Sequence, residues 1–143
     1  MKEKLEIIRK ILANNQEIDA SKIHNLMLDL FKTQFKGLHV ENYIGDYPTF
    51  IEPVYLGDKV KLGDDVLLGP NVYVGSNSEI GDYVQLTNSI ILDNVKIGAN
   101  INLENCVVAK DSSLNFNNLN IKNCIIIGKA NSEEDLKKIS FSI

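Results

Sequence analysis

The sequence predicts a mainly β protein whose central part is a parallel β-helix, and two nested repeats of different length carry this prediction. In the shorter repeat, an aliphatic residue followed by glycine recurs every six positions from residue 56 and returns after a break. Its copies are Leu56-Gly57, Leu62-Gly63, Leu68-Gly69, Val74-Gly75 and Ile80-Gly81, followed by Ile97-Gly98 and Ile127-Gly128. Self-similarity at a short fixed period is the sequence signature of solenoid architectures.

The longer repeat joins three of the shorter ones. Residues 86–91, 103–108 and 121–126 share one six-residue pattern. It begins with an aliphatic residue, a polar residue and an asparagine, and it continues with a serine or a cysteine and then two β-branched residues. Their starts lie 17 and then 18 residues apart, which corresponds to three six-residue units. The chain is therefore expected to wind in three-sided coils.

The composition of the repeat fits short strands separated by corners. Two inward-facing residues in every six are too sparse for an amphipathic helix, whose apolar positions follow a period of about 3.6 residues. Valine and isoleucine favour strands, whereas glycine and asparagine suit corners where the backbone φ is positive. Each coil buries its apolar residues only against its neighbours, so several coils are needed. Residues 51–130 provide about four.

These repeats resemble those of the bacterial transferase hexapeptide family. Residues 51–57 (IEPVYLG) and 88–91 (NSII) are similar to the C-terminal β-helix of sugar-1-phosphate nucleotidyltransferases. The resemblance covers roughly 80 of the 143 residues and implies a left-handed β-helix, although parallel crossovers are right-handed in most folds. It is specific for the fold rather than for an activity, because hexapeptide repeats serve many reactions.

The segments that flank the repeats are expected to be largely helical. One amphipathic helix is predicted over residues 2–13, and a second starts near Asp19 or Ser21, either of which can cap it. The expected organisation is a helical segment (1–37), a connector (38–50), the left-handed β-helix (51–130) and a short C-terminal helix and tail (131–143). Because a solenoid has open ends, the helices are interpreted as caps, with docking of a partner or second subunit as the alternative.

Composition and charge exclude some classes of protein. The net charge of −4 argues against nucleic acid as a partner, because phosphate binding needs a surplus of Lys and Arg. No apolar run approaches the roughly 20 residues that span a bilayer. Residues 1–4 lead into charged helical sequence rather than a signal peptide. We therefore expect a cytoplasmic protein, either free-standing or part of a longer enzyme.

Two histidines bear on acyl transfer. The family resemblance implies that a histidine in or beside the coils of an acyltransferase acts as general base, but His24 and His39 both precede the repeats. His24 lies beside the apolar stripe of a predicted helix and is interpreted as structural or solvated. His39 lies in the connector, from which it could reach a neighbouring subunit. The catalytic candidates are thus His39, with Asn105 or Tyr83 to orient the acceptor.

The sequence lacks residues that two other activities found with this repeat require. The glycine-rich G-x-G-T-R-type loop that cradles a triphosphate in nucleotidyltransferases has no match in the sequence. A γ-type carbonic anhydrase needs three zinc-binding histidines, and this chain has two. No metal site is predicted, and the aspartates Asp58, Asp64, Asp65 and Asp82 are interpreted as solvated turn residues.

Asparagine and small residues recur at one point of successive coils. The asparagines are Asn88, Asn105 and Asn123, and the residues that follow them are Ser89, Cys106 and Cys124. An asparagine ladder with side chains bonded along the stack is favoured over a row that contacts substrate. The two cysteines are expected in the core, close enough for a bridge but reduced in the cytoplasm. They form no CxxC pair for zinc or redox chemistry.

Tyrosines 18 residues apart indicate a shared outer face. Tyr55 and Tyr73 should stack there, and together with Leu67 and Tyr83 they predict an exposed apolar patch. Such patches usually mark interfaces, so the two tyrosines are candidates for self-association, with ordinary surface tyrosines as the alternative. The resemblance implies homo-oligomers, often trimers.

The sequence therefore predicts a non-catalytic or regulatory hexapeptide-repeat protein related to sugar-phosphate nucleotidyltransferases. It would act in self-assembly or as a partner subunit of such an enzyme, and it would need no cofactor. The alternative is an acyltransferase that uses acyl-coenzyme A to modify a hydroxyl or amino group of a sugar, at a site between two subunits.

Overall fold

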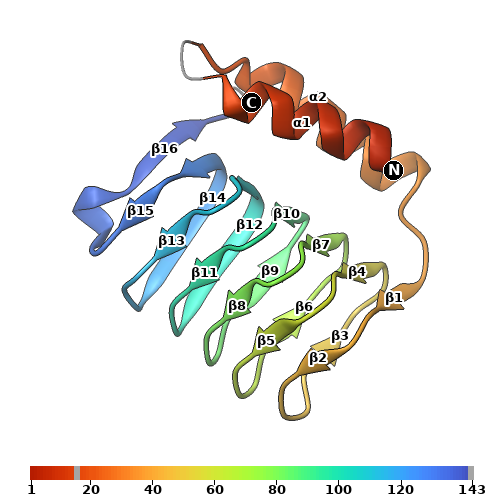
Figure 1. The fold of residues 1–143 in the computed structure, drawn as a ribbon, viewed down its shortest axis with the longest axis vertical. Helices are drawn as coiled ribbons and strands as arrows, with labels where there is room; N and C mark the ends of the chain where they lie inside the picture. Colours follow the sequence, from red (N-terminus) through yellow and green to blue (C-terminus); the bar gives the residue numbers. More distant parts are fainter. Residues whose placement is uncertain (15–16, 142–143) are drawn as a thin grey trace.

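The structure is a parallel β-helix with two α-helices lying along one side of it (Figure 1). It is a computed structural model, and it describes residues 1–14 and 17–141. Each coil contributes a strand to each of three faces, and equivalent strands of successive coils pair in parallel. The ladder of one face runs through β3, β6, β9, β12 and β14, so the chain makes about five coils.

The three faces are named here by number. Face 1 contains β1 (Leu38–Val40), β4 (Val54–Leu56), β7 (Val72–Val74), β10 (Ser89–Ile91) and the second halves of β12 (Ile101–Val108) and β14 (Leu119–Ile127). Face 2 contains β2 (Tyr43–Ile44), β5 (Val60–Leu62), β8 (Glu79–Ile80), β11 (Lys96–Ile97), β13 (Ser113–Leu114) and β15 (Lys129–Ala130). Face 3 contains β3 (Thr49–Phe50), β6 (Leu67–Leu68), β9 (Gln85–Thr87) and the first halves of β12 and β14.

Aliphatic side chains form one interior column, as the repeat predicts. Leu56, Leu62 and Leu68 are at most 6% exposed and belong to a single apolar cluster that continues through every coil. At about 25 cal/mol per Å² of buried apolar surface, this column is the main source of stability.

Corners are formed by asparagine more than by glycine. Of thirteen non-glycine residues with positive φ among those described, eight are asparagines, which tolerate this conformation. Most repeat glycines serve a different purpose, with Gly69 and Gly128, whose φ is positive, as exceptions: at Gly57 and Gly81, for example, φ is not positive, but a Cβ would lie within 3 Å of the next coil. These glycines are needed because neighbouring coils approach closely.

The first coil begins earlier than the sequence predicts. Residues 38–50, expected to be a connector, form β1, β2 and β3, which pair with β4, β5 and β6. The segment lacks the aliphatic-glycine repeat, so periodicity could not detect it. Its backbone nevertheless pairs with the second coil, which would otherwise present open edges.

The C-terminal segment is mostly extended rather than helical. A single 3₁₀ turn at Glu133–Asp135 is followed by β16 (Lys137–Ser140), which pairs antiparallel with β14. The acidic residues start a turn as expected. However, Ile139 and Phe141 then pack against the second apolar cluster described below, and this alternation favours a strand.

Helices α1 (Lys2–Ala13) and α2 (Ala20–Thr33) cover face 1 rather than an end of the solenoid. Asp19 caps α2, where its Oδ1 accepts a hydrogen bond from the backbone N–H of Lys22 at 3.1 Å. The inward faces of both helices pack on outward-facing residues of face 1, including Ile90, Val107 and Ile125. Capping was therefore the wrong interpretation, because face 1 is apolar on its outer side. Within the described residues, neither helix is long and apolar enough to cross a membrane.

Candidate functional site

An asparagine ladder follows the corner between faces 3 and 1, as predicted. Asn71 donates to Asn88 at 2.9 Å, and Asn105 donates to Asn123 at 2.9 Å. All four have positive φ and recur at intervals of 17 or 18 residues. The ladder therefore has a structural basis, since each amide side chain bridges neighbouring coils.

His24 joins this ladder from α2. Nδ2 of Asn105 lies 3.2 Å from Nε2 of His24, and the imidazole ring stacks on Phe141 with a 4.4 Å centroid separation. Because the same amide nitrogen donates to Asn123, its second hydrogen points to His24, which places the ring proton on Nδ1. His24 is thus a positioned, half-buried residue, and its Nε2 lone pair is occupied.

A groove of about 500 Å³ lies beside the ladder, under α2. It is lined by Leu28, Phe31, Lys32, Asn71, Asn88, Glu104, Asn105 and Asn123. Lys32 and Glu104 form no ion pair with each other in the described structure. The ladder side of the groove is polar, and the helix side combines apolar Leu28 and Phe31 with the charged Lys32.

His39 lies on β1, away from the groove. Its ring stacks on Tyr55 at 4.2 Å, and Nε2 lies 2.8 Å from the carbonyl oxygen of Lys36. A carbonyl only accepts, so Nε2 carries the proton. In this conformation His39 is a hydrogen-bond donor at Nε2 and has only Nδ1 available as a base.

Tyr83 lies at the corner between faces 2 and 3, and 58% of its surface is exposed. Asn105 lies at the opposite edge of face 3, and His39 belongs to the first coil. Within one subunit the structure does not bring these three catalytic candidates together.

Tyr55 and Tyr73 stack in register as predicted, but the patch they were expected to form is covered. The helices of the same chain pack against both tyrosines. Phe35 approaches Tyr55 at 4.6 Å, and Arg9 donates to the Tyr73 hydroxyl at 3.4 Å. Burial raises the pKa of the Tyr73 phenol above its usual value. The two side chains are half-buried parts of the helix-covered face rather than an exposed interface.

The aspartates at the corners bond to backbone. Oδ1 of Asp82 accepts from the backbone N–H of Asp64 at 2.8 Å, and Oδ1 of Asp93 accepts from that of Ser76 at 3.2 Å. No group of three or more metal-ligating side chains occurs among the described residues. Asp82 and Asp93 therefore join successive coils at their corners.

Both cysteines are buried and free. Their sulfur atoms lie 3.8 Å apart in successive coils. The hydrogen bond with Cys124, together with burial, raises the pKa of the Cys106 thiol above its usual range. They act as small core residues, as the sequence predicts.

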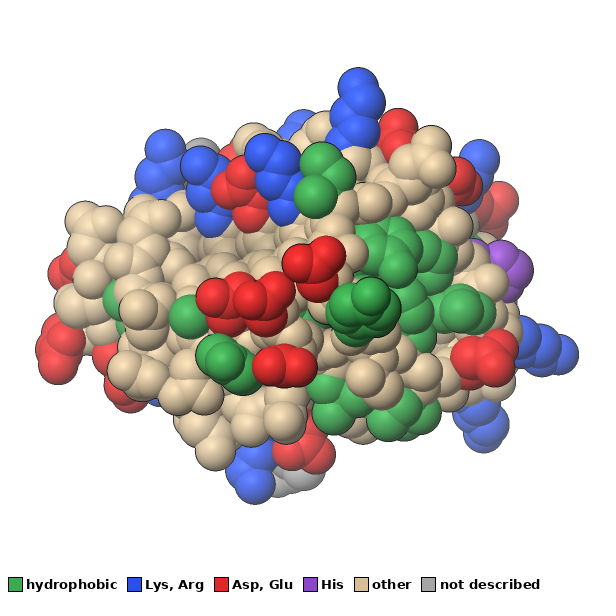
Figure 2. All heavy atoms as spheres, turned by 90° about the horizontal axis from the view of Figure 1, so that it is seen from below, with side chains coloured by type: hydrophobic (Ala, Val, Ile, Leu, Met, Phe, Trp, Pro, Cys, Tyr) green, Lys and Arg blue, Asp and Glu red, His purple; other side chains and the backbone are tan. Residues whose placement is uncertain are grey.

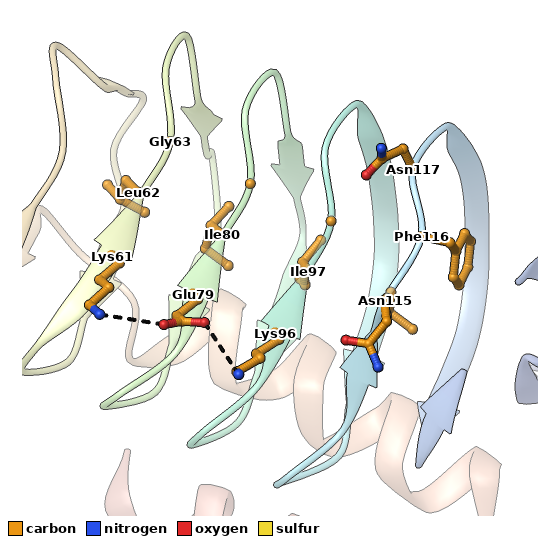
Figure 3. Close-up of a pocket in the computed structure, with 13 residues that line it drawn as sticks. Lys61, Leu62, Gly63, Glu79, Ile80, Lys96, Ile97, Asn115, Phe116 and Asn117 are labelled. Carbon is orange, nitrogen blue, oxygen red and sulfur yellow. Dashed lines mark ion pairs between the residues drawn. The ribbon is translucent and has the colours of Figure 1, made fainter. Parts of the chain in front are cut away.

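Face 2 carries a shallow groove that the sequence reasoning missed. Figure 3 shows a charged ladder in which Lys61 and Lys96 flank Glu79, with N–O distances of 3.5 and 3.7 Å. The groove of about 430 Å³ runs beside it over Gly63, Gly81 and Gly98 and ends at residues 115–117. The spacing of these charges at 17 and 18 residues was the signal that could have revealed the ladder.

The first coil forms an exposed apolar end of the solenoid, called here the first-coil patch. Its members and their exposed fractions are Leu38 (47%), Tyr43 (36%), Ile44 (68%), Tyr47 (94%) and Ile51 (45%). Apolar side chains gather at this end of the molecule, on the right in Figure 2. The sequence reasoning missed this patch because residues 38–50 were not recognised as a coil.

The fold and these surfaces define a hexapeptide-repeat β-helix protein. The model of the GMPPB C-terminal domain family matches residues 50–137, and the chain belongs to this family. This family describes a C-terminal module of sugar-1-phosphate nucleotidyltransferases. No curated protein matches the chain.

Two solved structures of hexapeptide-repeat acetyltransferases are similar to this chain. One, from Vibrio cholerae O1 biovar eltor in complex with acetyl coenzyme A, is 16% identical and has a TM-score of 0.51. The alignment covers 98% of this chain and 90% of that one. A second, from Vibrio cholerae, is 17% identical over 98% and 94% of the two chains, with a TM-score of 0.35. The first of these similarities shows the fold alone.

Proposed function

We propose that this chain is an assembly module whose first-coil patch pairs with the same patch of a second copy. The observation that carries the proposal is the contrast between the two ends of the solenoid. At one end apolar side chains and strand edges of all three faces are exposed, whereas at the other end β16 covers the edge of face 1 and Leu136 packs on the interior column.

Among residues 1–14 and 17–141, no strand pairs with the outer edges of the first coil on any of the three faces. Strands β1, β2 and β3 each pair on one side only, with β4, β5 and β6. An exposed row of backbone N–H and C=O groups is a template for pairing with another chain. Apolar residues beside such an edge, Ile44 and Tyr47 above all, supply the burial that makes the pairing stable.

The cover at the carboxyl-terminal end of the solenoid favours a head-to-head arrangement, in which the first coils of two copies meet. Strand β16 runs antiparallel along β14 (Figure 1). Leu136 packs against the interior cluster. Head-to-tail stacking would have to displace this cover. A contact between two first coils needs no displacement, and its two-fold symmetry closes the assembly as a dimer.

The patch is suited to a self-complementary contact. Its five members are apolar or aromatic, so two copies can bury them against each other, while the exposed Glu41 and Asp46 of the same coil would lie at the rim of the contact. Tyr43 packs edge-to-face on Phe50 with ring centroids 5.9 Å apart, which holds the Tyr43 ring in place at this end.

The test is the oligomeric state measured by sedimentation velocity and light scattering. The wild-type chain should have twice its monomer mass of 16.0 kDa. Ile44→Glu combined with Tyr47→Asn should be monomeric, and asparagine is chosen because it tolerates the positive φ of Tyr47. Ile7→Glu is the matched control, since Ile7 is a 40% exposed isoleucine on α1 outside the patch.

Circular dichroism checks that each variant remains folded. A wild-type monomer at roughly 100 μM would contradict the proposal, since contacts of this class reach micromolar affinity. A trimer would also contradict it, because a two-fold end contact cannot generate one.

We propose acyl-coenzyme A-dependent transfer to a sugar as the second candidate, supported by the glycine-floored groove of face 2. Its exposed backbone could bind the amides of a pantetheine arm, and Lys61 and Lys96 could attract phosphate groups. Acetyl-coenzyme A at millimolar concentration should then raise the melting temperature, because a ligand at 100 times its Kd stabilises by about 2.7 kcal/mol. Lys61→Ala with Lys96→Ala should abolish the shift. No shift in the wild-type chain would exclude this candidate.

A further inference from the structure

We propose that face 3 carries a binding site for neutral carbohydrate, formed by an amide row and an exposed tyrosine ring. The site, called here the amide face, consists of Tyr83, Gln85, Asn100, Asn102, Asn118 and Asn120. It is independent of the first-coil patch and of the groove on face 2.

Three amides stand in register on successive coils. Asn102 pairs with Gln85 on one side and with Asn120 on the other. All three side chains are exposed, and within residues 1–14 and 17–141 none of them has a hydrogen-bond partner. Since neighbouring strands lie about 4.8 Å apart, the row offers evenly spaced donors and acceptors to one ligand.

The corner amides beside this row are held in place. Nδ2 of Asn100 donates a hydrogen bond to Oδ1 of Asn118 in the next coil, at 2.6 Å. This bond fixes one rim of a groove of about 330 Å³, whose floor includes Ile101 and Leu119. A ligand on the row would therefore meet a fixed edge.

Tyr83 occupies its corner at an energetic cost. Its φ is 60°, the left-handed conformation that asparagine adopts at the equivalent corners of the next two coils, Asn100 and Asn118. A bulky residue in this conformation costs roughly 1–2 kcal/mol, which asparagine partly avoids. The ring is 58% exposed, so burial does not account for its presence. A ring retained here at a cost indicates a role in contact with another molecule.

The chemistry of the amide face selects the class of ligand. None of the residues that line the groove carries a charge, which disfavours phosphates, carboxylates and metal ions. Each amide both donates and accepts, as the hydroxyl groups of a sugar do. An exposed aromatic face beside such groups matches the apolar C–H face of a sugar ring. A neutral saccharide satisfies both features, whereas a second protein chain would need an apolar centre that this face lacks.

The test is a titration of the ¹⁵N-labelled full chain with glucose, mannose, galactose and maltose. The concentration rises to roughly 50 mM, which saturates a site of millimolar Kd. At least one sugar should shift the side-chain amide signals of Gln85, Asn102 and Asn120. A panel without any shift would overturn the proposal.

Matched variants locate the site. Tyr83→Asn removes the ring but keeps the preferred corner conformation, and it should weaken binding about tenfold, or roughly 1.4 kcal/mol. Asn102→Val keeps a strand-forming residue and should weaken binding similarly. Asn25→Ala removes an exposed amide on α2 and should leave binding unchanged. Equal affinity in all variants would overturn the proposal. So would amide signals that shift with protein concentration alone, which would assign the face to a second copy.

Discussion

Replacing Gly81 by alanine tests whether the repeat glycines are required by the spacing of the coils. A Cβ built at Gly81 would lie 2.6 Å from the carbonyl carbon and oxygen of Gly98 and 2.9 Å from the nitrogen of Ala99. Ordinary contacts between such atoms are about 3.5–4.0 Å. All three atoms belong to backbone, so no side chain can move aside, and the two coils must separate by about 1 Å.

The cost follows from what that separation breaks. The N–H of Gly81 donates to Ile97 O at 2.8 Å, and that of Glu79 donates to Val95 O at 2.8 Å. Lengthening both by about 1 Å removes two backbone hydrogen bonds of about 1 kcal/mol each. With residual overpacking of about 1 kcal/mol, the expected loss is about 3 kcal/mol. This lowers the melting temperature by roughly 6–12 °C.

Gly128 supplies the control. Its φ is 88° and no atom lies within 4 Å of the Cβ position, so conformation rather than space requires glycine there. Gly128→Asn should therefore be nearly neutral, whereas Gly81→Asn should be as destabilising as Gly81→Ala. Urea unfolding followed by circular dichroism measures the four free energies. A Gly81→Ala variant within about 0.5 kcal/mol of wild type, or a tolerated Gly81→Asn, would refute the spacing argument.

Three further predictions concern single side chains. Because burial raises the pKa of the Tyr73 phenol, the folded chain holds this proton more tightly than the unfolded chain. The contribution of Tyr73 to stability should be fully present below about pH 10 and should be lost as the pH rises through the folded pKa. The melting temperature of Tyr73→Phe should therefore fall less steeply with pH than that of the wild-type chain. Equal slopes of melting temperature against pH in the two proteins would contradict this prediction. Cys106 is buried with its pKa raised by the hydrogen bond to Cys124, so mass spectrometry should find it alkylated by iodoacetamide in urea but not in the native chain. Asn105→Gly, which keeps the positive φ, should destabilise the chain by about 1–2 kcal/mol in thermal unfolding because Nε2 of His24 and Oδ1 of Asn123 both lose their donor. An unchanged melting temperature would contradict this prediction.

The interior of the β-helix was predictable because each coil contacts only its neighbours. Leu56, Leu62 and Leu68 are separated by one short period in the sequence, and that local period alone specifies which side chains point inward. The asparagine ladder follows for the same reason, since Asn105 and Asn123 are one coil apart.

The outer surface was less predictable, because it depends on contacts between distant segments. Tyr55 and Tyr73 stack as their spacing indicates, yet whether their rings are exposed depends on helices more than twenty residues upstream. The hydrogen bond between His24 and Asn105, 81 residues apart in sequence, has no signature in either local segment.

Residues 38–50 show the limit of periodicity most clearly. They lack the repeat but form a coil, since the strand edges of β4, β5 and β6 accept any extended segment that can supply backbone hydrogen bonds. The same segment then presents Ile44 and Tyr47 at the open end.

The architecture of this protein, with its three-sided β-helix, interior column and asparagine corners, follows from the local repeat. Where the helices lie, which apolar residues remain exposed and which candidate residues are kept apart depends on long-range packing. The division has a physical reason. A solenoid interior is stabilised by contacts that repeat at short sequence separation, whereas its surface is defined by contacts between segments with no periodic relation.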